Sequence, residues 1–385
     1  MLVYLVVLFT IFFCIWLGSK YPGQKTNRVC AVFCCFLMVL VAGFRYRVGT
    51  DSLLYQDLYG FYPTIGQLTH QKIFSSRWSP LFVVWFSFWR TLSSSFVLYQ
   101  FVYAIILTHA VYLTLRQNTR LVLFGLALYF VYAFPYFTFD ICREGLAMSV
   151  FLYAFYFLRK EKIFLYYLIV VPAYFIHPGA FCVWFVPLLF RLKLTKKKSM
   201  IVFVSFLIGS IVAFKLTVFV LSVLPMTKIS WIALRYLGRY SSMGGVSLPQ
   251  IAFSCIAFYL AVYKNIGKAR NRQEQLCFNI AFISVLIMSM TKSIPFIFRL
   301  NTYFILFFFI AVCAYAERNV VMTKNYLLKF IVIILVCCSP VIMNYVKNPT
   351  TRNAYFPYVS VFNPYVVVDR EWHSRWEFLS YDESL

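Results

Sequence analysis

The sequence predicts an all-α fold, namely a polytopic helical membrane protein with about 12 transmembrane helices. Of its 385 residues 62% are apolar and only 12% are charged, and long apolar runs recur along the whole chain. Soluble domains carry about 25% charged residues. The polar stretches between the runs are too short to fold separately, so we expect one membrane domain over residues 1–346. Residues 347–385 are expected to form a polar, aromatic outer tail.

Each predicted span is an apolar run close to the roughly 20 residues that a helix needs to cross a bilayer. The run at residues 80–92 is short for a span, and counting it as a crossing would place Arg116, Arg120 and the basic cluster at 159–162 on the wrong side of the membrane, so it is interpreted as a re-entrant or interfacial segment. A broken helix is expected at His177-Pro178, because the residue before a proline is disfavoured in helical geometry. The 12 spans are residues 1–18, 29–44, 96–115, 121–138, 139–158, 163–176, 178–190, 199–224, 249–263, 275–292, 296–316 and 326–346.

The distribution of charge predicts how these spans are oriented. A net charge of +24 would point to nucleic acid in a soluble protein. Here the cations cluster in six loops between apolar runs, which hold 20 of the 36 Lys and Arg residues but only 3 of the 12 acids. Loops rich in Lys and Arg stay in the cytoplasm. Both termini are therefore expected on the outer face.

This threading brings several ionisable residues to the outer mouths of the spans. Charged groups at such depth are costly unless they are paired or solvated in a cavity, which makes them candidates for function. We expect them to line one polar pocket that opens outward. They are Arg45, Arg47, Asp51, Asp140, Arg143, Glu144, His177, Arg235, Arg239 and Arg299.

Some of these residues also have structural interpretations. Asp140, Arg143 and Glu144 stand at i, i+3 and i+4, which places them on one helical face. Either acid could orient Arg143, or the group could be an ion pair that ties two spans together. His177 is suited to proton transfer at a helix break, although a lone membrane histidine is also a common packing residue.

The arginines in the second half of the chain differ in how far they favour function. Arg235 and Arg239 share one face of a predicted interfacial helix, where contact with lipid headgroups is as good an explanation as substrate binding. Arg299 lies inside an apolar run near its outer end, and for this residue we favour a functional role.

Several absent motifs narrow the chemistry. The chain has no G-x-x-x-x-G-K-[ST], H-E-x-x-H or G-x-S-x-G motif and no Asp-x-Asp pair. Its 11 cysteines lie within or beside apolar runs, so neither a zinc site nor a disulfide framework is expected. We expect no metal and no cofactor. An arginine-rich outer pocket suits a substrate that carries phosphates, because guanidinium groups bind phosphate oxygens in pairs.

Three blocks of the chain resemble one family. "GFRYRVGTDSLLY", "DICREGLAMSVFLYAFYFL" and "FIHPGAF", in this order and spacing, are similar to the EpsG/Wzy-type polysaccharide polymerases of O-antigen, exopolysaccharide and capsule synthesis. The resemblance covers about Gly43 to Arg299. It implies a GT-C-like glycosyltransferase in the bacterial inner membrane. That enzyme would join repeat units carried on undecaprenyl pyrophosphate at the periplasmic face, by an inverting transfer. A chain-length regulator and a flippase of the same pathway would be further partners.

The resemblance and the residues together assign roles to the candidates. Asp51, His177 or Glu144 would take the proton of the acceptor hydroxyl; the family usually has Gln at the position of Glu144. Tyr55 would stack on a sugar ring, or belong to the aromatic belt of a membrane protein. The pyrophosphate would be bound by Arg45, Arg47, Arg143, Arg235, Arg239 and Arg299. The alternatives are a flippase or transporter of the same lipid-linked sugar, and a membrane O-acyltransferase that acts on polysaccharide through His177.

Overall fold

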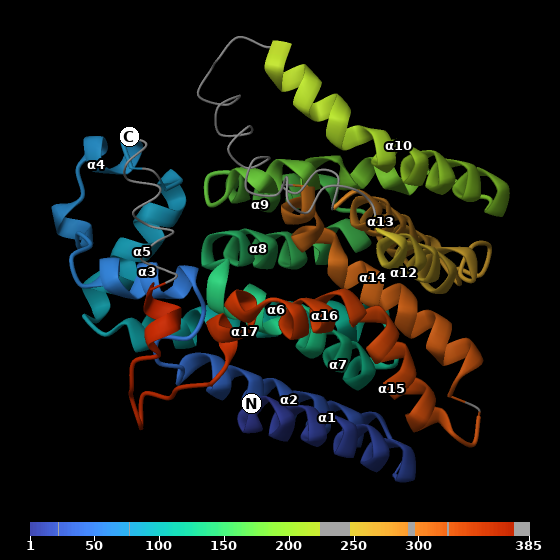
Figure 1. Cartoon of the computed structure of the whole chain (residues 1–385), viewed down its shortest axis with the longest axis horizontal. Coiled ribbons are helices and arrows are strands. Elements are labelled where there is room, and N and C mark those ends of the chain that lie inside the picture. The colour runs from blue at the N-terminus through green and yellow to red at the C-terminus, as the bar shows by residue number, and fades with distance from the viewer. Residues whose placement is uncertain (22, 77, 224–246, 292–296, 322, 373–385) are drawn as a thin grey trace. The chain divides into compact units, whose positions relative to one another are not determined.

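The computed structural model describes residues 1–385 except 22, 77, 224–246, 292–296, 322 and 373–385, and it divides the chain into two compact units (Figure 1). The first unit combines Met1–Trp184 with Ile331–Leu385, and the second is Phe185–Phe330. All the regular elements of the described residues are helices, and none is a strand. Two isolated bridges, Arg45 with Ser360 and Ser360 with Asn363, are the β contacts among these residues. The predicted all-helical class is confirmed.

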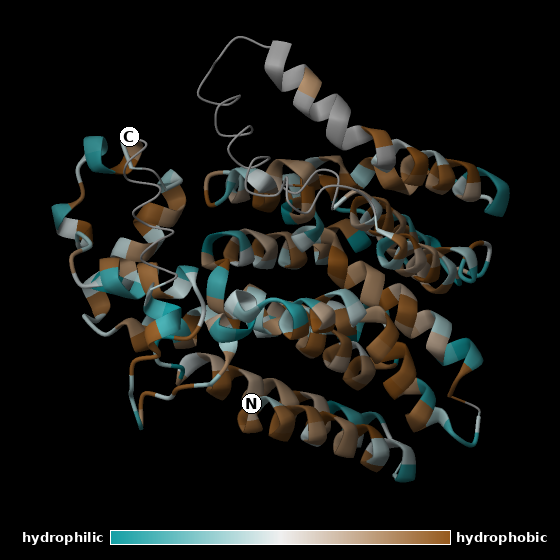
Figure 2. Cartoon of the chain, in the orientation of Figure 1, coloured by the Kyte–Doolittle hydropathy of each residue, from teal (hydrophilic) through white to brown (hydrophobic). Residues whose placement is uncertain are grey.

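The first unit is a bundle of apolar helices. α2 packs on α1 and α6, α6 packs on α8, and α8 packs on α9, while α7 lies against α1. The apolar side chains of these helices meet in the core, and the polar residues gather at their ends (Figure 2). The helices are α1 (Leu2–Lys20), α2 (Gln24–Gly43), α6 (Phe96–Asn118), α7 (Val122–Tyr132), α8 (Cys142–Arg159) and α9 (Ile163–Ala173).

Two sets of shorter helices complete this unit. One set follows α2 and comprises α3 (Asp51–Tyr59), η1 (Ile65–Gln67), α4 (His70–Phe74) and α5 (Pro80–Leu92). The other set leads to the C-terminus and comprises α15 (Tyr326–Cys337), which begins in the second unit, α16 (Ser339–Lys347) and α17 (Pro349–Tyr355). α5 has 13 residues and is therefore about 20 Å long at 1.5 Å per residue, which is the short helix that the apolar run at 80–92 predicted.

The second unit is built around α14. This helix packs most extensively on α13, and the π-helical turn η5 lies against it as well. Asn265 ties η5 to α14, because its Nδ2 donates to the carbonyl of Ala311 at 2.9 Å. The helices of this unit are α10 (Lys196–Val223), α12 (Leu248–Phe258), η5 (Tyr259–Tyr263), α13 (Arg272–Met290) and α14 (Phe298–Asn319), and η3 (Pro178–Arg191) leads into it.

Fewer spans are evident from length and composition than the sequence predicted. Within the described residues five helices are long and apolar enough to cross a membrane, namely α1, α2, α6, α13 and α14. α15 and α16 would add a sixth, but they are bent by 61°. The sequence predicted a single span over 326–346. The structure breaks it before Pro340, which stands in the first turn of α16. Proline has no backbone N–H, and this is tolerated at the start of a helix but not within one. The break expected at His177-Pro178 is confirmed, since α9 ends at Ala173 and η3 begins at Pro178.

The two ends of α6 carry different chemistry. Near its start, Gln100 Nε2 donates to the carbonyls of Gly43 and Arg45 at 3.3 and 3.2 Å. Near its end, Arg159 donates to Gln117 at 3.3 Å, which joins α6 to the end of α8. The 23 residues of α6 measure about 34 Å, the thickness of a bilayer. Gln100 and Gln117 are 17 residues apart, about 26 Å along the helix axis, so the block that begins at Gly43 and the basic end of α8 lie at opposite ends of α6.

Candidate functional site

The loop after α2 is bound along its length to the C-terminal segment, which we define as residues 348–372. Tyr46 N–H donates to the Val359 carbonyl at 2.9 Å, and Gly49 N–H donates to the Ala354 carbonyl at 2.8 Å. In the opposite direction, Val361 N–H donates to the Phe44 carbonyl at 2.9 Å. Residues more than 300 positions apart therefore share one backbone network.

Asp140 holds this network to the bundle. Its carboxylate is 4% exposed and accepts the Thr50 N–H at 2.6 Å, and it also accepts the Tyr355 hydroxyl. Gly49 makes room for it: with φ +102° and an added Cβ 2.5 Å from Asp140 Oδ1, this position excludes any side chain. One buried carboxylate thus joins the loop, the turn before α8 and the C-terminal segment.

Asp140 does not share a helical face with Arg143, contrary to our expectation. It ends the π-helical turn η2 (Tyr136–Asp140), and Ile141, with φ −86° and ψ 51°, separates that turn from α8. The helical register is interrupted at this point, and Asp140 faces Thr50 and Tyr355 instead.

Arg45 lies beneath the same loop. Its side chain is 1% exposed and donates to the Ala42 carbonyl at 2.5 Å and to Ser52 Oγ at 3.2 Å. The guanidinium carbon lies 5.0 Å from the centre of the Phe139 ring. This burial gives Arg45 a part in holding the loop, while its predicted binding of pyrophosphate stays a prediction.

Arg47 is engaged by two acids. It donates to Asp57 Oδ1 at 2.6 Å and, through Nε and Nη2, to both carboxylate oxygens of Glu371, the bond from Nη2 being 2.6 Å long. The hydrogen bonds to Glu371, and then those to Asp57, raise the pKa of Arg47 above its ordinary value. Any phosphate bound by Arg47 would have to displace these carboxylates.

Arg143 stands in the first turn of α8 and meets α3. Its Nε donates to the Tyr55 hydroxyl at 3.0 Å, and its guanidinium carbon is 5.9 Å from the centre of the Trp78 ring. Tyr55 is 3% exposed, and its ring packs against Trp78, Phe82 and Phe86. The phenol therefore presents its hydroxyl to Arg143, and its ring has little surface left for the sugar stacking that we predicted.

The three candidate bases lie on different elements of the first unit. Asp51 is the first residue of α3, one turn before Tyr55. Glu144 is 3% exposed in the first turn of α8. His177 lies in the break between α9 and η3, and this break is joined to α5 because Leu81 N–H donates to the Phe175 carbonyl at 2.9 Å.

The remaining predicted arginines lie in the second unit or outside the described residues. Arg299 is the second residue of α14, in the second unit. Arg235 and Arg239 lie outside the described residues. Their roles stay predictions.

A comparison with known families agrees with the resemblance carried by the three sequence blocks. The model of the EpsG family matches residues 28–360. The chain belongs to the EpsG family. No curated protein and no solved structure matches it significantly. Membership indicates a membrane enzyme of the glycosyltransferase type that acts as a polysaccharide polymerase in surface polysaccharide synthesis.

The structure of this EpsG-family chain adds residues that the sequence did not single out. Arg370 is 2% exposed and donates to three carbonyls, those of Arg47 at 2.6 Å, Asn353 at 2.9 Å and Pro357 at 2.7 Å. Together with Tyr355 and Glu371 it fastens the C-terminal segment to the loop. The polar and aromatic composition of residues 348–372 was the one feature of the sequence that set this segment apart. It gave no information on which residues Tyr355, Arg370 and Glu371 would contact.

Proposed function

We propose that this EpsG-family chain joins oligosaccharide repeat units at the outer face of the bacterial plasma membrane. The donor is a growing glycan on undecaprenyl pyrophosphate, and the acceptor is a sugar hydroxyl of an incoming lipid-linked unit. The acceptor oxygen bonds to the anomeric carbon as the bond from that carbon to the pyrophosphate breaks, so the configuration inverts. Undecaprenyl pyrophosphate leaves, and the acceptor proton passes to a base of the protein.

The observation that carries this proposal is the contact between Arg143 and Tyr55, which unites two of the family blocks at 3.0 Å. The bond from Arg143 Nε to the Tyr55 hydroxyl fixes the orientation of the guanidinium. A fixed guanidinium beside an aromatic wall is suited to the negative charge that develops on a departing pyrophosphate. We assign Arg143 to that charge, and the predicted binding of pyrophosphate by Arg299, in the second unit, stays a separate prediction.

We assign to Asp51 the role of the base that accepts the proton of the acceptor hydroxyl. Positions i and i+4 of a helix lie on one face, so Asp51 and Tyr55 share a face of α3. Tyr55 contacts Arg143, so the face of α3 that carries Asp51 and Tyr55 is the face next to the proposed phosphate site. Glu144 is more deeply buried, and His177 lies on another element, so they rank second.

The geometry of the first unit supports an outer location. The site lies at the end of α6 that is remote from Arg116 and Arg159, and Lys- and Arg-rich loops remain cytoplasmic. We also propose the full set of 12 crossings in a GT-C-like arrangement. The six candidate spans, the four shorter apolar helices (Val122–Tyr132, Ile163–Ala173, Pro178–Arg191 and Leu248–Tyr263), α8 and α10 make up this number.

Reconstitution of the purified protein in liposomes with lipid-linked repeat unit tests the function. A polymerase yields a ladder of lengthened glycans and releases undecaprenyl pyrophosphate. Movement of the lipid-linked unit across the bilayer without lengthening would identify a flippase, and an acylated sugar would identify an acyltransferase. Either of these two results without a ladder overturns the proposal.

A further inference from the structure

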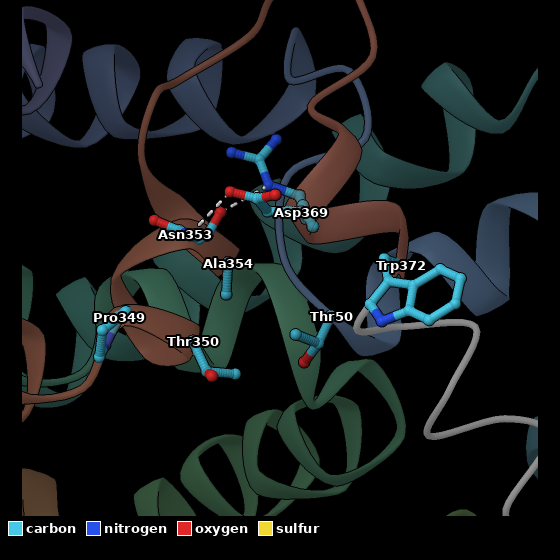
Figure 3. A pocket seen from close by; sticks show the side chains of 8 residues that line it. Thr50, Pro349, Thr350, Asn353, Ala354, Asp369 and Trp372 are labelled. Atoms are coloured by element: carbon cyan, nitrogen blue, oxygen red, sulfur yellow. Dashed lines mark hydrogen bonds between the residues drawn. The ribbon is translucent and has the colours of Figure 1, made fainter.

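A cavity of about 210 Å³ lies between the loop after α2 and the C-terminal segment (Figure 3). Thr50 contributes from the loop, and the other lining residues come from the C-terminal segment. Asn353 and Asp369 lie close together on one side, and Trp372 stands at one end. The remaining lining residues are Pro349, Thr350, Ala354 and Arg370.

The polar groups of this cavity suit hydroxyl groups. Asn353 Nδ2 lies 3.5 Å from the Asp369 carboxylate, so an amide and a carboxylate present donors and acceptors side by side. A hydroxyl can donate to Asp369 and accept from Asn353 at the same time. Ligand pockets characteristically combine a few placed polar groups of this kind with apolar and aromatic walls.

The charges in the cavity argue against an anionic ligand. Arg370 is the only cation among the lining residues described, and its guanidinium is committed to three backbone carbonyls. Asp369 is exposed and repels a second negative charge. The cavity is therefore built for a neutral part of a ligand and not for its pyrophosphate.

Trp372 provides an aromatic surface at the rim. It is 70% exposed although its indole is large and apolar, and it lines a second, more open cavity of about 450 Å³. The second cavity is also lined by Tyr46, Arg47, Asp57 and Glu371. One ring therefore borders two adjoining cavities, and a chain of linked rings could pass over it with its C–H faces against the indole.

We propose that Trp372, Asn353 and Asp369 form a carbohydrate subsite that holds one neutral sugar ring of the glycan substrate. The volume fits a part of a ligand, since pockets for whole drug-sized ligands begin at about 300 Å³. The subsite begins at Thr50, the residue before the proposed base Asp51, so a sugar bound there lies beside the reacting hydroxyl. This inference rests on the proposed polymerase function for the identity of its ligand.

Binding without turnover tests the subsite. The probes are the repeat-unit oligosaccharide freed from its lipid and pyrophosphate by mild acid, a longer glycan of several units, and undecaprenyl pyrophosphate without sugar. Their affinities for the full-length protein in detergent are measured by titration calorimetry. Trp372→Ala is expected to weaken binding of a sugar probe about tenfold, which corresponds to about 1.4 kcal/mol, and to leave undecaprenyl pyrophosphate binding unchanged.

The two sugar probes distinguish the source of the ring. A larger loss with the single unit assigns the subsite to the incoming acceptor, and a larger loss with the longer glycan assigns it to the growing chain. Asn353→Ala and Asp369→Asn should act in the same direction as Trp372→Ala. Tyr365→Ala is the matched control, because Tyr365 is an exposed aromatic residue of the same segment that lines neither cavity.

Two results would overturn the subsite. One is unchanged sugar affinity in Trp372→Ala, and the other is a loss confined to undecaprenyl pyrophosphate, which would make the cavity a headgroup site. Both are separable from failure of the polymerase proposal. If the ladder forms but sugar affinity does not depend on Trp372, only the subsite fails; if sugar binding depends on Trp372 but no ladder forms, only the polymerase proposal fails.

Discussion

The hydroxyl of Tyr355 donates to the carboxylate of Asp140, which lies 215 residues earlier in the chain. The same carboxylate accepts the Thr50 N–H. The side chains of Asp140 and Tyr355 are both buried. Three distant stretches of sequence therefore depend on one carboxyl group. Removal of a hydrogen-bond donor from a buried acceptor costs about 1–3 kcal/mol.

Tyr355→Phe should lower the free energy of unfolding by about 1–3 kcal/mol and slow chain lengthening, because Asp140 loses a donor and the loop before Asp51 loses its anchor. Thermal unfolding in detergent and the ladder assay measure the two effects. Tyr345→Phe is the control, since the Tyr345 ring packs on Tyr355 but its hydroxyl has no hydrogen-bond partner in the described structure. Equal effects of the two variants would contradict the anchoring role.

Gly49→Ala should impair both folding yield and activity. The new Cβ would lie 2.5 Å from Asp140 Oδ1, and the backbone has φ +102°, which an L-residue rarely adopts. We expect a loss of about 1–3 kcal/mol in stability from strain of this kind. Gly60→Ala is the matched control, because nothing lies within 4 Å of its added Cβ. Normal unfolding temperature in Gly49→Ala would show that the loop tolerates a side chain.

Arg143→Ala should reduce the rate of chain lengthening by about 10²–10³-fold, as removal of one oxyanion-stabilising donor does in other enzymes. Arg143→Lys should recover only part of that rate, because a point charge cannot reproduce the planar guanidinium fork. Protein abundance and unfolding temperature check that both variants fold. Full activity in either variant would remove Arg143 from the proposed site.

Arg299→Ala should also abolish the ladder if the second unit contributes to the pyrophosphate site. Its effect should appear in undecaprenyl pyrophosphate binding as well as in turnover, because both depend on contacts with phosphate oxygens. Titration of undecaprenyl pyrophosphate measures the first. A variant with normal binding and a normal ladder would confine the site to the first unit.

Glu371→Gln should destabilise the protein by about 1–3 kcal/mol, since it weakens the charged hydrogen bonds to Arg47. Folding raises the pKa of Arg47, so its contribution to stability is complete at any pH below the ordinary pKa of an arginine and is lost only as the pH rises above that range. The loss should therefore be equal at about pH 6 and pH 9. Glu317→Gln, which breaks a pair with the more exposed Arg270, should cost less than about 1 kcal/mol.

The all-helical class of fold could be predicted from the sequence, because apolar runs and short basic loops are local patterns. The break at His177-Pro178 was predictable for the same reason, as is the shortness of α5. The break at Pro340 was missed although proline offered the signal, because the run 326–346 has the length and composition of a single span.

The candidate site was only partly accessible to sequence reasoning. Arg143 was identified from its charge beside an apolar run, but the periodicity argument also placed Asp140 on its helix, and the turn at Ile141 prevents this. The roles of Tyr355 and Arg370 arise from partners that lie far away in the chain. Spacing within one sequence carries no information about such pairings.

The fastening of residues 348–372 onto the loop after α2 bears on how the protein matures. The ribosome makes this segment after α1 to α16, so these helices can enter the bilayer before Asp140 meets Tyr355 and Arg47 meets Glu371. A nascent chain that stops after α16 retains all the apolar runs yet lacks the residues that close the loop. Synthesis of residues 348–372 is thus the step that lets an inserted bundle close its outer loop.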